Sequence, residues 1–317
     1  MLSVLAVAFP FFALVLCGYA ATRRGLLPQS AIPGLNAFVL FFALPCMLYR
    51  FGAATPVGLL LDPGALGIYL ACALAMVGLA VAWARRQRLG WNDAAFGALV
   101  AAFPNTGFMG VPLLAALLGA QAAGPVMLAI AVDMVITTSL CIALSRLDGA
   151  GGVGPALRRA LRGMLANPMA WSIALGALAS ALQWRLPGPL EQLVALLAGA
   201  ASPVALFTIG AVLARSRMNA HEHVPARAYV PLALAKLVLH PLLVFGAGRA
   251  AMALGLPLAA PALTALVLVA ALPGASNVSL LAERFGAHTG RIARIILVST
   301  ALSFLSFSAA VAWLAPR

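Results

Sequence analysis

The chain consists of long runs of apolar residues separated by short polar connections. About 20 apolar residues are needed to cross the hydrocarbon core of a bilayer as an α-helix. Ten runs have about this length: Leu2–Ala21, Ile32–Tyr49, Ala65–Ala84, Asp93–Leu118, Ala122–Leu144, Leu165–Ala181, Leu190–Ala214, Ala228–Ala251, Leu258–Leu281 and Ile292–Leu314. Their positions do not alternate between polar and apolar, as they would in the strands of a membrane β-barrel. The pattern therefore predicts an all-α polytopic membrane protein with ten transmembrane helices.

The composition agrees with a chain whose solvent is lipid. Of its 317 residues, 64% are apolar or aromatic and 9% are charged. Soluble domains are near half apolar and a quarter charged, so an ordinary water-soluble domain is excluded. The four cysteines lie in four different runs, which gives no support to a disulfide framework or a metal site.

The distribution of charge predicts the orientation in the membrane. A net charge of +13 would suggest a nucleic-acid partner in a soluble protein. Here 15 of the 20 basic residues lie in or beside the odd-numbered connections, and four lie in the even-numbered ones or at the termini. By the positive-inside rule the odd-numbered connections are cytoplasmic and both termini lie outside. Membrane insertion and contact with anionic lipid thus explain the charge without a nucleic acid.

The first run is expected to be a retained helix and not a cleaved signal peptide. Its basic pair, Arg23-Arg24, follows the apolar stretch instead of preceding it, and the stretch is longer than the apolar part of a signal peptide. All ten runs are therefore counted as spans.

Ten spans can form two five-helix repeats of opposite orientation, because an odd number of spans inverts the second half. The first repeat would comprise residues 1–144 and the second residues 165–317, joined by a cytoplasmic linker at 145–164. Matching positions are interrupted by proline: Pro45 in the second run has a counterpart in Pro203 of the seventh. The fourth and ninth runs are interrupted in a similar way, which favours the repeat.

The interruptions of the fourth and ninth runs predict helices that break near the middle of the membrane. Pro104, Gly107 and Pro112 interrupt the fourth run, and Pro273-Gly274 interrupts the ninth. Proline removes a backbone donor and glycine lowers helix stability. Backbone groups freed at such a depth are tolerated only where they line a cavity or meet other protein groups. The alternative is a pair of kinks that serve helix packing alone.

Polar residues beside the two breaks are candidates for substrate binding. They are Asn105, Thr106, Gly107, Ser276 and Asn277. Two broken helices that cross would aim half-helix N-termini, with free N–H groups and positive dipole ends, at a common point. The sequence therefore predicts an anion site at the breaks.

Three ionisable residues lie deep in other spans. Asp133 is near the centre of the fifth run, with Thr137 one turn on, and Lys236 and His240 lie one turn apart in the eighth. Charges at this depth are costly, so they should face protein or water and have partners. Lys236 is a candidate counter-ion for substrate, and Asp133 or His240 a candidate protonatable coupling group. The alternatives are a structural pair, or a lysine that reaches toward the interface.

A stripe of hydroxyl groups on the tenth run is explained by helix packing. Ser299, Ser303 and Ser306 follow at spacings of four and three residues, so they share one face of a helix. No nucleophile elbow, HExxH motif or phosphate loop occurs, and the sequence therefore predicts no catalytic residues. A membrane-embedded enzyme or sensor and a channel are the competing function classes.

Several segments resemble the auxin efflux carrier (AEC) family, which includes bacterial malonate-type permeases and plant auxin exporters. The segments are Leu35–Phe51, Phe103–Pro112, Ser202–Gly210, Lys236-Leu237 with Pro241, and Pro273–Asn277. The resemblance covers essentially the whole chain. It implies a fold like that of sodium/bile acid symporters, with spans 1, 2, 6 and 7 as scaffold and spans 3–5 and 8–10 as a moving transport unit. Pro104, Asn105, Pro273, Asn277 and Lys236 would then lie at or near the crossover of helices 4 and 9.

The resemblance also implies a function. It indicates a secondary or facilitative carrier of small organic anions, working by an elevator-type movement in the bacterial cytoplasmic membrane. A cofactor is not implied, H⁺ or Na⁺ are the candidate coupling ions, and a sodium-coupled symporter is the runner-up. A homodimer through the scaffold helices is a possible assembly. The linker at 145–164 is short compared with the long loop of plant exporters, and the third run contains no acidic residue for coupling.

Overall fold

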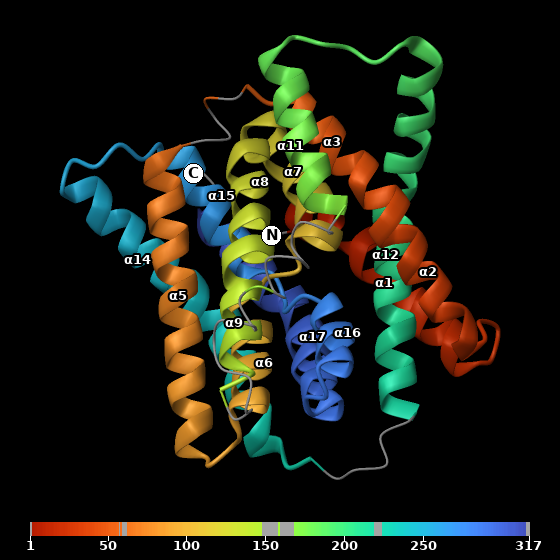
Figure 1. Ribbon diagram of the computed structural model, residues 1–317, viewed down its shortest axis with the longest axis vertical. Coiled ribbons are helices and arrows are strands. Elements are labelled where there is room, and N and C mark those ends of the chain that lie inside the picture. The colour runs from red at the N-terminus through yellow and green to blue at the C-terminus, as the bar shows by residue number, and fades with distance from the viewer. Residues whose placement is uncertain are drawn as a thin grey trace. The chain divides into compact units, whose positions relative to one another are not determined.

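The structure, a computed structural model, describes residues 2–56, 62–147, 168–218 and 224–314, with the single positions 58 and 158. Regular structure in these residues is helical, and they form no β-sheet (Figure 1). Most of the expected linker at 145–164 lies outside the described residues. The chain forms two compact units. Unit 1 comprises Met1–Asp62, Thr106–Leu128 and Asn167–Ala220, and unit 2 comprises Pro63–Asn105, Ala129–Ala166 and His221–Arg317.

The helices of each unit follow from the apolar runs. Those of unit 1 are α1 (Leu2–Arg23), η1 (Gln29–Ala31), α2 (Ile32–Phe38), η2 (Val39–Ala43), α3 (Leu44–Ala54), η3 (Thr106–Gly110), α7 (Val111–Leu118), η4 (Gly119–Ala122), α11 (Pro168–Ala181) and α12 (Gly188–Met218). Those of unit 2 are α5 (Pro63–Arg86), α6 (Trp91–Ala102), η5 (Asp133–Thr137), α9 (Thr138–Leu144), η6 (Ala226–Ala228), α13 (Val230–Leu234), η7 (Ala235–Leu239), α14 (His240–Ala253), α15 (Ala260–Ala271), α16 (Asn277–Arg284) and α17 (Thr289–Leu314). Helix α8 (Ala123–Val132) begins in unit 1 and ends in unit 2.

Six helical stretches of the described chain are long and apolar enough to cross a membrane. They are Gln29–Ala54, Pro63–Arg86, Ala123–Leu144, Gly188–Arg215, Val230–Ala253 and Thr289–Leu314. Four shorter apolar helices lie at Phe9–Arg23, Thr106–Leu118, Trp171–Ala181 and Ala260–Ala271. Each of these segments falls on one of the apolar runs. The chain is an all-helical membrane protein.

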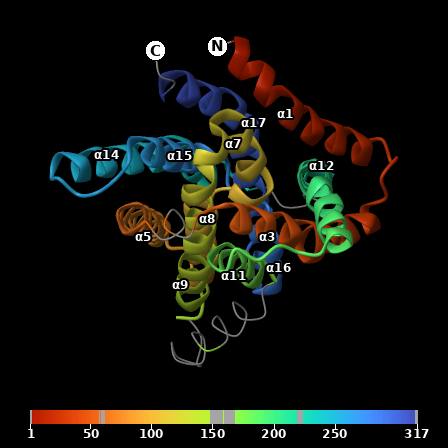
Figure 2. The ribbon, with the colours of Figure 1, turned by 90° about the horizontal axis from the view of Figure 1, so that it is seen from above.

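Unit 1 is held by two close helix crossings. Helix α1 packs against α12, and α11 packs against α3 (Figures 1 and 2). Where α12 meets α1, a Cβ on Gly210 would collide with the Val15 carbonyl of α1. Where α11 meets α3, a Cβ on Gly176 would lie 2.6 Å from the Tyr49 carbonyl of α3. Glycine allows the two backbones to touch, as is typical of helix packing in membranes.

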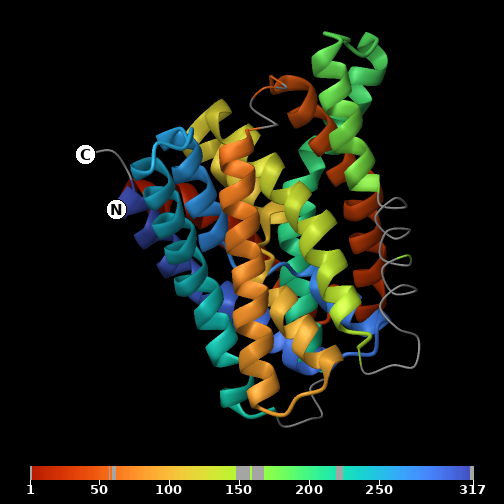
Figure 3. The ribbon, with the colours of Figure 1, turned by 60° about the vertical axis from the view of Figure 1, so that its left-hand side comes forward.

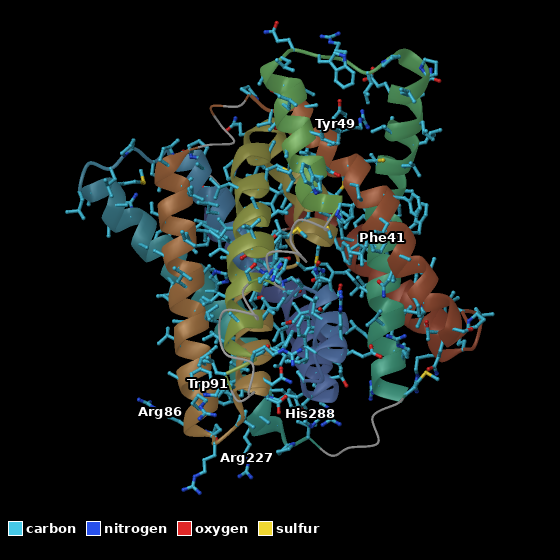
Figure 4. The ribbon with its side chains drawn as sticks, viewed as in Figure 1. Phe41, Tyr49, Arg86, Trp91, Arg227 and His288 are labelled. Atoms are coloured by element: carbon cyan, nitrogen blue, oxygen red, sulfur yellow. The ribbon has the colours of Figure 1, made fainter. Side chains whose placement is uncertain are left out.

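In unit 2 the other helices pack around the short helices α6 and α15. Helix α5 packs against α6 and α14, and α14 packs against α15 (Figure 3). The buried Arg291 at the start of α17 joins three elements, since Nε donates to the Ala228 carbonyl (2.8 Å) and Nη1 to the Asp93 carbonyl (3.2 Å). Arg86, Trp91, Arg227 and His288 lie at one end of this unit (Figure 4).

Four π-helical turns occur in the described chain, and three of them directly precede a proline. The turns η2, η3 and η7 end two residues before Pro45, Pro112 and Pro241. Proline cannot donate to the carbonyl four residues earlier and its ring clashes with it. A wider turn removes the conflict, because the helix bond then reaches five residues back, as from His240 to the Ala235 carbonyl. The fourth turn, η5, has no proline after it and begins at Asp133.

Candidate functional site

Two helices of unit 2 stop in the middle of an apolar run and meet at their interruptions. Helix α6 ends at Ala102 and α15 ends at Ala271. The extended segments that follow them pair in antiparallel fashion through Pro104 and Gly274. The Asn105 N–H donates to the Pro273 carbonyl (2.8 Å), and the Ala275 N–H donates to the Phe103 carbonyl (3.0 Å). Residues 103–105 and 273–275 are called the crossing below.

The chemistry of proline explains where these helices stop. Pro104 and Pro273 have no N–H to continue the helix ladder, and each is buried. Backbone groups released by the interruption need partners, because lipid and the apolar interior offer none. The crossing supplies them: each broken segment satisfies a donor and an acceptor of the other.

Glycine at position 274 is required by the closeness of the crossing. A Cβ on Gly274 would lie 2.8 Å from the Val100 carbonyl oxygen and 2.9 Å from the Val100 Cγ2. Contacts shorter than 3.0 Å are essentially never made by real Cβ atoms. The Gly274 N–H donates a hydrogen bond to the Ser299 Oγ of α17 (3.2 Å). The crossing is therefore attached to a third helix as well.

The structure brings three of the expected substrate-binding residues to the crossing. Asn105 belongs to it and is 4% exposed, and Ser276 follows it directly and is 7% exposed. Asn277 is half-buried and begins α16. These side chains offer amide and hydroxyl donors next to the interrupted helices.

Three further expected residues belong to unit 1. Thr106, which is fully buried, and Gly107 begin η3, and Pro112 is the second residue of α7. Apart from its chain neighbours and the backbone of its own helix, no heavy atom of the described residues lies within 4 Å of the place that a Cβ on Gly107 would take. The glycine therefore borders open space.

Lys236 is fully buried in the π turn η7 and holds the end of a broken helix. Its Nζ donates to the Ala270 carbonyl (2.6 Å) and lies 3.1 Å from the His240 Nδ1. In a continuous helix the Gly274 N–H would bond to that carbonyl. The ammonium group replaces the missing donor, and its charge is favourable at the negative end of α15. His240 is also fully buried, and its Nε2 has no hydrogen-bond partner among the described residues.

Asp133 is fully buried and finds neutral partners. Its carboxylate accepts hydrogen bonds from the Tyr69 hydroxyl (2.7 Å) and the Thr137 hydroxyl (3.2 Å). The Tyr69 ring in turn lies beside the His240 ring, with centroids 6.2 Å apart. Within unit 2 the carboxylate and the Lys236 ammonium therefore belong to one polar cluster without a direct ion pair. The π turn at Asp133 has no proline to explain it, and such turns are frequent at functional sites.

Three parts of the site were not anticipated from sequence. Tyr69 lies in an apolar run where a tyrosine is indistinguishable from a packed core residue, so no local signal marks it. The carbonyl of Ala270 carries no residue-specific signal at all. Ser299 was visible in the serine stripe, but its bond to Gly274 depends on which helix packs beside the interruption.

Comparison with known proteins agrees with these features. The chain matches the family model described as "Membrane transport protein" over residues 3–150 and 156–311. It is 31% identical over 314 residues to a protein of Rhizobium meliloti named "Putative malonate transporter", covering 96% of this chain and 93% of the relative. It is 26% identical over 305 residues to the "Uncharacterized transporter YfdV" of Escherichia coli K12, covering 94% and 92%.

A plant relative shows the breadth of the family. The rice protein "Auxin efflux carrier component 3a" is 30% identical over 130 residues, which cover 37% of this chain and 20% of the rice protein. The resemblance recognised from the motifs is confirmed by these matches. The chain belongs to the membrane transport protein family that includes the auxin efflux carriers, and it is a multi-pass membrane transporter.

Proposed function

We propose that this protein is a secondary or facilitative carrier of small carboxylates, with its substrate site at the crossing. The observation that carries the proposal is the pairing of two interrupted helices through Pro104 and Gly274. In membrane transporters, interrupted helices near the midplane typically build the substrate site. The relative named for malonate makes a short dicarboxylate the first substrate to test.

The chemistry at the crossing suits a carboxylate. Asn105, Ser276 and Asn277 offer neutral hydrogen-bond donors, and Thr106 and Gly107 follow directly in the chain. The first turn of α16 adds backbone N–H groups and a positive dipole end. Lys236 uses two of its three N–H donors for the Ala270 carbonyl and His240. In the proposal its positive charge acts as the counter-ion of the cargo.

Ten spans in two inverted repeats are part of the same proposal. The helix pairs support it: α1 of the first half packs against α12 of the second, and α11 of the second packs against α3 of the first. An inverted repeat requires such reciprocal pairing. The basic and interfacial side chains at one end of unit 2 agree with a cytoplasmic face there (Figure 4).

Alternating access would use the two sets of helices as scaffold and transport unit. The separation into compact units supports part of this assignment, since α1, α3, α11 and α12 share unit 1 and α5, α6, α14, α15 and α17 share unit 2. The second half of the fourth run, α7, differs from the assignment because it belongs to unit 1. An elevator-type movement of the second set would carry the crossing with its bound substrate.

Asp133 is the better of the two candidate coupling groups. His240 lies 3.1 Å from the Lys236 ammonium, so a proton on both nitrogens of its ring would place two positive charges in contact. Asp133 can gain or lose a proton while Tyr69 and Thr137 remain its partners. Sodium coupling is the alternative. It is less favoured because the freed Ala270 carbonyl, a natural cation ligand, is occupied by an ammonium group.

Transport in proteoliposomes tests the proposal. Labelled malonate, succinate, acetate and pyruvate are supplied under imposed proton, sodium and voltage gradients. We expect saturable uptake of at least one carboxylate and counterflow, whereas a channel would show neither saturation nor counterflow. Asn105→Ala and Asn277→Ala should each lower uptake, and Thr264→Ala, whose hydroxyl bonds to its own helix, serves as the control. Unchanged flux in both asparagine variants would remove the crossing from the mechanism.

A further inference from the structure

Two buried serines of α17 have the same local environment but different long-range contacts. Ser299 and Ser303 are one turn apart and both 0% exposed. Each hydroxyl donates to a carbonyl of its own helix, Ser299 to Ile296 (3.1 Å) and Ser303 to Thr300 (2.8 Å). The Ser299 Oγ additionally accepts the N–H of Gly274 (3.2 Å). The two serines therefore differ in one hydrogen bond, and that bond ends at the crossing.

The Gly274 N–H is half of a single broken helix bond. In a continuous α15 it would donate to the Ala270 carbonyl. At the interruption the Ala270 carbonyl accepts a hydrogen bond from Lys236 of η7, and the Gly274 N–H donates one to Ser299 of α17. The donor and the acceptor are thus each held by a side chain from a different helix. A buried N–H without such a partner would have given up its hydrogen bond to water and gained none in the protein, which is destabilising.

Among the described residues, the partner of the N–H at the middle of residues 273–275 is the Ser299 hydroxyl. The bonds of Asn105 and Ala275 flank Gly274, whose own N–H points to α17 and not to the other segment. A Cβ on Gly274 would lie 2.8 Å from the Val100 carbonyl oxygen, so a side chain does not fit there. The lateral position of the crossing relative to α17 is consequently set by the Ser299 hydroxyl.

We infer that Ser299 is a positioning residue of the transporter: by accepting the Gly274 N–H it holds the crossing in its binding geometry and thereby sets the affinity for substrate. The inference rests on the proposed substrate site at the crossing. It assigns to Ser299 a role beyond the small-residue packing that its stripe predicts.

The test compares Ser299→Ala with the matched control Ser303→Ala. Malonate uptake into proteoliposomes gives KM and maximal rate, and hydrogen–deuterium exchange of the purified proteins reports on the amides of residues 272–277. Ser299→Ala should raise KM about three- to tenfold, the effect of one hydrogen bond, with a smaller change in maximal rate. It should also speed exchange in this segment. Ser303→Ala should leave the exchange of the segment and KM as in the wild type.

Ser299→Cys keeps the size of the side chain but offers a weak acceptor, so its KM and exchange should lie between those of wild type and Ser299→Ala. This variant decides the question if Ser299→Ala does not fold. Equal KM and equal exchange in the two alanine variants would overturn the inference. If wild-type protein transports none of the carboxylates, the proposed function fails, and faster exchange in Ser299→Ala alone still supports the structural part.

Discussion

Gly274→Ala is the sharpest test of the crossing, because the structure leaves no room for a methyl group. The added Cβ would lie 2.8 Å from the Val100 carbonyl oxygen, and the neighbour it meets is backbone, which cannot rotate away. Residues 273–275 and the last turn of α6 must move apart by several tenths of an ångström. Overpacking of this kind costs about 1–3 kcal/mol. Weakening the two flanking backbone hydrogen bonds adds about 1 kcal/mol.

We expect this cost of about 2–4 kcal/mol to weaken the free energy of substrate binding. It corresponds to at least about a 30-fold loss of apparent affinity. Uptake of labelled malonate as a function of concentration measures it, and exchange at residues 272–277 reports the separation directly. Gly246→Ala is the control, since no heavy atom of the described residues outside its own helix lies within 4 Å of its added Cβ on α14. Wild-type KM and wild-type exchange in Gly274→Ala would refute the close backbone contact on which the reasoning depends.

Further substitutions probe other parts of the molecule. Asp133→Asn should abolish the stimulation of uptake by an inward proton gradient, because an amide cannot carry the proton; stimulation equal to wild type would exclude Asp133 as the coupling group. Gly210→Ala should reduce the yield of folded protein in fluorescence-detected size exclusion by forcing apart α1 and α12, at a cost of about 1–3 kcal/mol, and a normal yield would contradict that contact. The nearest atoms to the added methyl group of Gly248→Ala belong to the movable Leu263 side chain, so the melting temperature should fall slightly, whereas that of Gly246→Ala should not.

The interruptions of the helices could be predicted from sequence because their cause is local. Proline lacks an N–H wherever it occurs, and the helices do end at Ala102 and Ala271, just before Pro104 and Pro273. The hydrogen bond between Asp133 and Thr137 is likewise a matter of spacing along one helix.

The contacts between helices could not be predicted in the same way. The pairing of the two broken segments, the bond from Tyr69 to Asp133 and the bond from Lys236 to Ala270 join residues 34 to 170 positions apart. Periodicity reports which face of a helix is apolar but does not identify the neighbour of that face. The sequence leaves a structural pair of buried charges open as one alternative. In the structure Asp133 accepts hydrogen bonds from hydroxyl groups, and Lys236 bonds to a backbone carbonyl and to His240.

The reciprocal pairing of helices in unit 1 has a consequence for biosynthesis. Helices α1 and α3 emerge early from the ribosome, yet their partners α12 and α11 are made only after residue 167. The two early helices must therefore remain in the membrane, with their contact faces uncovered, until more than half of the chain has been translated. Such late contacts slow assembly and expose the chain to misassociation. For the same reason, α1 and α3 should assemble when the two halves are co-expressed as separate chains but not when the first half is expressed alone. Each half brings the surface that the other needs.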